Sequence, residues 1–280
     1  MRLLTIQMQD KTAAAIERGG NRFLIQGNAG NTFTDVGALL KHGEDWRQLA
    51  ENASEAAPAG ARVRRPVLDP GVIVCVGLNY RTHILEMGRE LPSVPTYFAK
   101  FPRALTDPEV TIALPKASDK VDYEGELTVV IGKGGRNIAK DRAWDAVAGL
   151  TLLNDVSMRD FQKRSIQFLA GKTWEASTPF GPVMVTADEF KDFTATEVVT
   201  RVNGEERQRA PMSELVFGVP ELIADLSQIM TLRPGDLIAT GTPGGVGTAM
   251  KPPQYLQDGD VVEVSMEPIG ILRNTFARAT

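Results

Sequence analysis

Three acidic residues stand at alternate positions in the stretch DKVDYEGELTVVIGKG, just before the middle of the 280-residue chain. On an extended backbone, Asp122, Glu124 and Glu126 would project from one face, because side chains alternate with a period of two. The apolar, β-branched run at 127–131 is typical of a strand that enters a core. Like charges at the entrance to a core favour a bound cation, which would lower their pKa values.

A hard divalent cation is the first interpretation of these carboxylates. Glu124 and Glu126 could bind one ion together, and Asp155, at the end of the apolar run GLTLLND, is the best candidate for a third ligand. Oxygen ligands with open positions favour Mg²⁺ or Mn²⁺, with Ca²⁺ as an alternative. Two histidines and one cysteine disfavour zinc. The competing interpretation is an exposed edge strand that carries charge, and a short motif alone does not separate the two.

A histidine and a glutamate in VGLNYRTHILEMGRE are the second group that could do chemistry. His83 stands three residues before Glu86, a spacing that places both side chains on one helical turn. A carboxylate at that distance can fix the imidazole tautomer and raise its basicity, as a general base acting on water requires. Such pairs are also common on ordinary surface helices, and His42 is assigned no role.

Composition limits the class of partner and compartment. The chain carries 31 basic and 35 acidic residues, interspersed, for a formal charge of -4, so we expect a small-molecule substrate and neither nucleic acid nor a membrane surface. The single cysteine, Cys75, lies in an apolar run and is interpreted as a packed thiol. No apolar segment approaches the roughly 18 residues that span a bilayer. We expect a cytoplasmic, soluble protein.

The pattern of elements divides the chain into two parts. Residues 1–65 contain short strand-like runs, a helical stretch and an Ala-, Glu- and Pro-rich linker, and predict a small N-terminal α+β domain. Residues 66–280 contain many short strands separated by turn signals and few long helices. They predict one strand-rich, mixed α/β catalytic domain without the regular alternation of a doubly wound sheet.

Two glycine-rich stretches do not indicate a nucleotide. TGTPGGVGTAM lacks the Gly-Lys-Ser/Thr ending of a P-loop, and IGKGGRN lacks the third glycine of the dinucleotide motif. We expect the first stretch to form a tight loop that brings backbone close to the substrate.

Seven blocks of the sequence resemble the fumarylacetoacetate hydrolase family in order and spacing. They are VGLNYRTHILEMG, FAKFPRALT, DYEGELTVVIG, LNDVSMRDFQ, AGKTWEASTPFGP, NGEERQ and ATGTPGGVG. The resemblance covers about residues 66–280, and seven ordered blocks are far more specific than one motif. It implies a catalytic core of mixed sheets, arranged as a β-sandwich or roll with short helices, and a homodimer.

The same resemblance implies roles for individual residues. It implies a metal bound by Glu124, Glu126 and Asp155, and a water-activating dyad of His83 and Glu86. Lys172 corresponds to the active-site lysine of the family. The residues implied to bind substrate are Tyr80, Arg159, Gln162 and Thr242.

The chain also departs from the family pattern at two places. Thr173-Trp174-Glu175 stands where many relatives have Ser-Phe-Asp, and Lys100-Phe101-Pro102 where many have Lys-Pro. The bulky side chains of Trp174 and Phe101 are expected to reshape the pocket around the acyl group.

Three functions follow from these patterns. The first is a metal-dependent hydrolase that cleaves a carbon–carbon bond in an acylpyruvate or related β-diketo acid, with the metal stabilising the enolate. The second is a decarboxylase, isomerase, hydratase or lyase of the same family that acts on an oxaloacetate-like or hydroxymuconate-like 2-oxo acid. The third, of another class, is a non-catalytic metal-binding protein.

Overall fold

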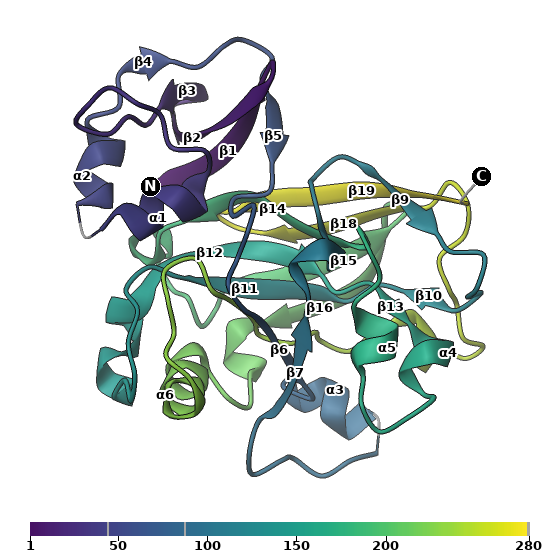
Figure 1. Ribbon diagram of the computed structural model, residues 1–280. Helices are drawn as coiled ribbons and strands as arrows, with labels where there is room; N and C mark the ends of the chain where they lie inside the picture. Colours follow the sequence, from purple (N-terminus) through teal and green to yellow (C-terminus); the bar gives the residue numbers. More distant parts are fainter. Residues whose placement is uncertain (44, 87, 279–280) are drawn as a thin grey trace.

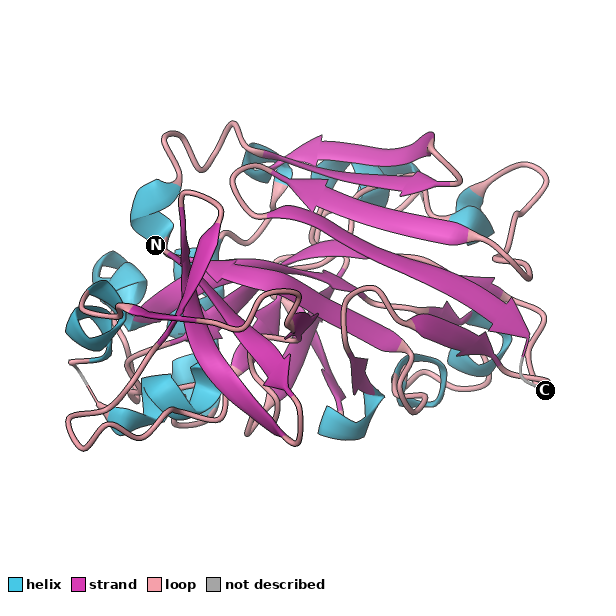
Figure 2. Cartoon of the chain, turned by 90° about the horizontal axis from the view of Figure 1, so that it is seen from above, coloured by secondary structure: helices cyan, strands magenta, loops and turns pink. Residues whose placement is uncertain are grey.

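The fold is built mainly from strands, which form three sheets. The computed structural model describes residues 1–43, 45–86 and 88–278, and within them a 12-stranded, a five-stranded and a two-stranded sheet. Figure 1 shows the N-terminal strands at one corner of the molecule, and Figure 2 shows the helices around the outside of the strands. The predicted strand-rich, mixed α/β class is confirmed.

The large sheet runs in the order β4-β3-β2-β1-β14-β12-β11-β17-β6-β7, with β5 beside β1 and β8 beside β14. Its strands are β1 (Arg2–Met8), β2 (Lys11–Arg18), β3 (Asn21–Leu24), β4 (Glu55–Ala56), β5 (Arg62–Arg64), β6 (Ile73–Gly77), β7 (Thr96–Lys100), β8 (Leu105–Thr106), β11 (Gly125–Ile131), β12 (Val147–Asn154), β14 (Thr178–Val185) and β17 (Leu237–Ala239). Every residue of β11 and β12 is buried. Leu127, Val129 and Ile131 of β11 belong to one core cluster and Val130 to another, so the apolar part of this strand is covered on both faces.

The five-stranded sheet packs on the large one. Its order is β16-β15-β18-β19-β9, formed by β16 (Glu205–Pro211), β15 (Glu197–Val202), β18 (Val261–Met266), β19 (Gly270–Arg278) and β9 (Thr111–Leu114). Val198 and Val264 share a core cluster with Leu127 of β11. At Gly125 the sheets come so close that an added Cβ would lie 2.0 Å from Thr200 Oγ1, so only glycine fits between the two glutamates of the EGE motif.

The smallest sheet and the short helices complete the part of the fold that surrounds the acidic residues. The sheet pairs β10 (Val121–Asp122) with β13 (Ser157–Met158). The helices are α1 (Val36–His42), α2 (Trp46–Glu51), α3 (Arg81–Glu86), α4 (Arg159–Gln162), α5 (Leu169–Lys172) and α6 (Val219–Ile229). Short 3₁₀ turns are η1 (Pro102–Ala104), η2 (Lys140–Ala146), η3 (Ala187–Glu189), η4 (Met212–Glu214) and η5 (Gly247–Ala249). In Figure 1, α3, α4 and α5 gather on the lower right side, and α5 contacts both α4 and β7.

The N-terminal strands continue the large sheet. β1 pairs antiparallel with β14, with Arg2 opposite Val185 and Leu3 opposite Met184. The domain boundary after residue 65 stays a prediction, because hydrogen bonding crosses it. Among the described residues, no helix is long and apolar enough to span a membrane.

Asn79 connects the segment before α3 to two other parts of the chain. Its Nδ2 donates to the carbonyls of Phe217 at 3.0 Å and Thr240 at 2.8 Å, and its Oδ1 accepts from the Phe217 N–H at 2.8 Å. The side chain is only 1% exposed, so these three bonds are shielded from water. Asn79 therefore fixes the segment between β6 and α3, and with it the position of His83.

We expect Asn79→Ala to lower the free energy of unfolding by roughly 2–4 kcal/mol, because it leaves several buried backbone groups without partners. Urea denaturation of the wild type and variant measures the change. Asn52→Ala, at an exposed position, is the matched control and should stay within about 0.5 kcal/mol of the wild type. An equal effect of the two substitutions would contradict this role for Asn79.

Candidate active site

The structure brings the three carboxylates at Glu124, Glu126 and Asp155 together. One oxygen atom from each lies within 4.8 Å of the others, and all three residues are buried. Asp155 follows β12, which pairs with β11, so the adjacent ends of two neighbouring strands supply the cluster. An exposed, charge-decorated edge strand, the competing interpretation of this sequence, is excluded by the burial.

The backbone between Asp122 and Gly125 is not the continuous strand that the sequence pattern predicts. β10 ends at Asp122 and β11 begins at Gly125. The Glu124 carbonyl accepts from the Asp155 N–H at 2.8 Å, and the Glu124 N–H donates to Asn154 Oδ1 at 3.0 Å. These bonds replace the regular ladder and connect the backbone of one acidic residue directly to that of another.

Three buried cations stabilise the carboxylates. Lys172 Nζ donates to Glu124 Oε2 at 2.7 Å and to Asp155 Oδ2 at 2.8 Å. Arg159 Nη1 lies 2.6 Å from Glu124 Oε1, and Lys100 Nζ donates to Asp155 Oδ1. Burial alone raises the pKa of Glu124, but the charges of Lys172 and Arg159 outweigh it and hold the pKa below its ordinary value. Burial lowers the pKa of Lys172, and Asp155 and Glu124 outweigh that effect and raise it.

Asp122 does not take part in this cluster but supports it. The residue is fully buried and accepts from Arg159 Nε at 2.8 Å, from Gly247 N–H at 2.8 Å and from Thr248 N–H at 2.9 Å. Asp122 therefore fixes the Arg159 guanidinium. Its full burial excludes a solvated carboxylate at the entrance of a strand.

Glu126 is the carboxylate of the cluster without a cationic partner among the described residues. Its Oε2 accepts from the Gly241 N–H at 2.9 Å. Burial raises the pKa of Glu126, and the charges of Asp155 and Glu124 add to the rise.

The donor set fits a divalent cation. Four buried carboxylates, including Asp122, face three buried cations, which leaves one negative charge in excess. All the ligand atoms are carboxylate oxygens, as Mg²⁺ and Mn²⁺ prefer. Bound by Glu124, Glu126 and Asp155, such an ion would offset the excess.

His83 and Glu86 face each other on α3 without a direct hydrogen bond. His83 Nδ1 and Glu86 Oε2 are 3.8 Å apart, and Nδ1 is buried with no hydrogen-bond partner among the described residues. Burial lowers the pKa of His83, and the charges of Glu124 and Glu86 oppose this only in part. His83 is therefore neutral at pH 7, and the charge of Glu86 acts in favour of its protonated form.

A cavity of about 350 Å³ adjoins this cluster. It is lined by Val76, Gly77, Leu78, His83, Arg89, Phe98, Glu124, Arg159, Gln162, Lys163, Ser165, Phe168, Lys172, Thr242, Val246 and Thr248. Among the residues that the sequence predicts for the site, six line this cavity and come from five separate stretches of the chain. Its volume is typical of a small-molecule site.

Tyr80 and Thr242 are placed differently from one another. Tyr80 is fully buried, with its hydroxyl 3.8 Å from Met212 Sδ, and does not line the cavity. Thr242 does line it, while its hydroxyl accepts from Gln208 Nε2 at 2.8 Å and donates to the Gly125 carbonyl at 3.0 Å.

The bulky residues Trp174 and Phe101 are not among the lining residues, so the expected reshaping of the pocket by them does not occur through direct contact.

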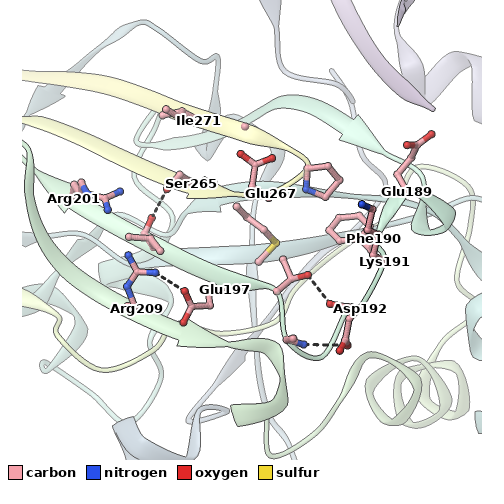
Figure 3. Close-up of a pocket in the computed structure, with 16 residues that line it drawn as sticks. Glu189, Phe190, Lys191, Asp192, Glu197, Arg201, Arg209, Ser265, Glu267 and Ile271 are labelled. Carbon is pink, nitrogen blue, oxygen red and sulfur yellow. Dashed lines mark hydrogen bonds and ion pairs between the residues drawn. The ribbon is translucent and has the colours of Figure 1, made fainter.

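A wider hollow of about 840 Å³ lies elsewhere, on the five-stranded sheet and the loop after η3. Figure 3 shows its charged side chains, among which Arg209 pairs with Glu197. Asp192 is satisfied within its own loop by Thr194 and Ala195. This hollow contains none of the residues of the acidic cluster and no unpartnered buried group, so its larger volume does not make it the functional site.

The sequence interpretation missed two kinds of group in the site. Lys100 was noted only as a departure from a family pattern, although a lysine at the end of the apolar strand TYFAK signals a buried charge that needs a partner. The glycine-rich loop was expected to approach a substrate. Three residues of this loop, Thr242, Val246 and Thr248, line the cavity, and its amides at Gly241 and Gly247 also donate to Glu126 and Asp122, which the sequence did not predict.

A buried carboxylate trio, three cations and a neutral histidine beside one cavity define an enzyme site with oxygen ligands for a metal. Residues 72–277 match the family described as Fumarylacetoacetate (FAA) hydrolase C-terminal. The chain belongs to the fumarylacetoacetate hydrolase family, as its sequence blocks predicted.

Individual relatives agree with this assignment. A Bacillus subtilis (strain 168) protein named oxaloacetate tautomerase YisK is 44% identical over 241 residues, which cover 81% of this chain and 80% of that protein. Among solved structures, a fumarylacetoacetate hydrolase from Exiguobacterium antarcticum matches with a TM-score of 0.88 and 35% identity over 100% of both chains. Maleylpyruvate hydrolase from Sphingobium sp. SYK-6, in complex with manganese(II) and pyruvate, matches with a TM-score of 0.80 and 27% identity over 100% of both chains.

We expect the NMR titration of His83 to have its midpoint below pH 6.5, because burial disfavours the imidazolium. His42 is the one other histidine of the sequence, so the variant His42→Gln assigns the signal. Glu86→Gln should lower the midpoint further, since the Glu86 carboxylate raises the pKa of His83. A midpoint at or above 6.5 would show that charge, and not burial, dominates at this ring.

We expect Lys100→Met to lower the free energy of unfolding by roughly 3–5 kcal/mol, because it leaves the buried Asp155 with one cationic partner fewer. Added Mg²⁺ or Mn²⁺ should restore more stability to this variant than to the wild type, since the excess negative charge is larger. Thermal unfolding with metal or chelator measures both effects. Lys116→Met, at an exposed lysine, should change neither, and an equal response of the two variants would refute the role of Lys100.

Proposed function

We propose that this chain interconverts the enol and keto forms of an oxaloacetate-like 2-oxo acid, with Mg²⁺ or Mn²⁺ bound by Glu124, Glu126 and Asp155. The observation that carries the proposal is the buried, neutral His83, whose Nδ1 has no partner among the described residues and which lines the same cavity as Glu124. The similarity to the Bacillus subtilis protein named as an oxaloacetate tautomerase supports this choice within the family.

The reaction needs little machinery beyond one positioned base. Tautomerisation moves one proton between the carbon beside the ketone and the ketone oxygen, the double bond shifts between C=C and C=O, and no bond of the carbon skeleton breaks. Neutral His83, which lines the cavity, can accept and return that proton through its imidazole ring. A divalent ion on the three carboxylates would supply Lewis-acid stabilisation of the negative charge that develops on the substrate.

Arg159 is the group best placed to hold the carboxylate next to the ketone. Asp122 accepts from its Nε and Gln162 Oε1 accepts from its Nη1 at 3.0 Å, so the guanidinium is fixed. Its Nη2 is buried and has no partner among the described residues. A substrate carboxylate that accepts from Nη2 would satisfy the last donor of Arg159.

Hydrolysis of an acylpyruvate is the second candidate, and the similarity to a maleylpyruvate hydrolase favours it. It would use the same cation and the same base, but His83 would activate a water molecule and a carbon–carbon bond would break. A non-catalytic metal-binding protein is the third, and it requires that no 2-oxo acid be turned over.

One panel of substrates separates these functions. Enol-oxaloacetate and acetylpyruvate are incubated with the protein and Mg²⁺, Mn²⁺ or a chelator. Ketonisation is followed by loss of the enol absorbance, and acetate and pyruvate are quantified as products. We expect metal-dependent ketonisation that falls by about 100-fold or more in His83→Ala, the usual size of a general-base contribution.

His42→Ala is the matched control, since it removes the other histidine, which packs against Phe33. It should leave ketonisation unchanged. Acetate release from acetylpyruvate without ketonisation would replace the first proposal by the second. Metal binding without turnover of either compound would support the non-catalytic alternative.

A further inference from the structure

Two cationic side chains line the cavity without a role in the acidic cluster. Arg89 follows α3, and its N–H donates to the Ile84 carbonyl at 3.1 Å. Lys163 follows α4, and its N–H donates to the Arg159 carbonyl at 3.1 Å. Each is thus attached to a helix that carries a residue of the proposed chemistry, His83 in one case and Arg159 in the other.

The charges around the cavity leave these two cations without a partner. Within the described chain, the side chains of Arg89 and Lys163 form neither an ion pair nor a hydrogen bond, and both residues are exposed. Glu124 is the one carboxylate among the sixteen lining residues, and Arg159 and Lys172 already pair with it. The edge of the cavity therefore carries positive charge that no lining residue neutralises.

The cations lie in two distinct settings. Arg159 is 5% exposed and offers one buried, unpartnered N–H group. Arg89 and Lys163 are exposed; Arg89 follows α3, and Lys163 directly follows α4, the helix that carries Arg159. A ligand with one anionic group satisfies only the buried donor. A ligand with a second carboxylate can also reach the exposed pair, and a cavity of about 350 Å³ suits a small diacid.

We propose that Arg89 and Lys163 bind the distal carboxylate of a 2-oxo dicarboxylate and so select diacids over monoacids. The inference rests on the proposed function, because it assigns the near carboxylate and the ketone to the Arg159 end of the cavity. It adds the two residues that recognise the second carboxylate and so determine specificity. Arg89 supplies a planar fork that matches a carboxylate, and Lys163 supplies a compact charge.

The test measures binding apart from turnover. 3,3-Difluorooxaloacetate has two carboxylates but no hydrogen on the carbon beside its ketone, so it cannot enolise. Pyruvate has the same 2-oxo acid end and no second carboxylate. Calorimetry with the Mg²⁺-loaded protein gives the affinity of each compound for the wild type, Arg89→Gln, Lys163→Gln and the double variant. Arg81→Gln, on α3 but outside the cavity lining, is the matched control.

We expect each single substitution to weaken difluorooxaloacetate binding about tenfold and the double substitution by more, the usual size for a charge-assisted contact. Pyruvate binding should change by less than about twofold in every variant, and Arg81→Gln should affect neither compound. Equal weakening of both compounds, no weakening of either, or no preference of the wild type for the diacid would overturn the proposal. If the preference is found but enol-oxaloacetate is not ketonised, the proposed reaction fails and the assignment of Arg89 and Lys163 survives.

Discussion

Burial of four carboxylates with three cations is the constraint on which the rest of the structure depends. Moving a charge out of water costs several kcal/mol, and a buried pair offsets this cost only when its geometry is good and its remaining lone pairs are satisfied. Asp155 meets the condition with Lys100 and Lys172, and Glu124 with Lys172 and Arg159. Glu126 meets it only in part, through one backbone N–H, and this partial pairing makes the cluster suited to a metal.

The fold can be understood as the arrangement that delivers these partners. β7 ends at Lys100, β12 leads into Asp155, α5 ends at Lys172, and the glycine-rich loop after β17 supplies amides to Glu126 and Asp122. None of these segments is adjacent to the others in sequence. The two sheets that position them approach so closely at Gly125 that no side chain fits there. The short, irregular elements around the site are therefore fixed by charge pairing as well as by apolar packing.

The sequence predicted the alternating carboxylates of Asp122, Glu124 and Glu126, and it predicted Asp155 as a further ligand. Alternation on an extended chain and the end of an apolar strand are both local patterns. It predicted the strand-rich class for the same reason. It did not predict the break between β10 and β11, since the bonds that replace the ladder come from Asn154 and Asp155, about 30 residues away. The position of Lys100 at the end of an apolar strand signals a buried charge, but the partners of Lys100 and Gly241 lie across the fold and leave no local signal. Tyr80, implied to bind substrate, is packed against Met212 because its ring completes the core.

The same cluster explains how a neutral base can exist beside carboxylates. The negative charges of Glu124 and Glu86 favour the imidazolium of His83, and burial favours the neutral ring. Burial is the larger effect, and Arg159, which pairs with Glu124, partly cancels the charge of that carboxylate at His83. A divalent ion bound by Glu124, Glu126 and Asp155 would reduce that charge further and make the neutral form of His83 more favourable still. The ion pairs that stabilise the carboxylates in the core thus also favour the neutral form of His83 that the proposed reaction requires, so the stability of the site and its proposed chemistry have one physical origin.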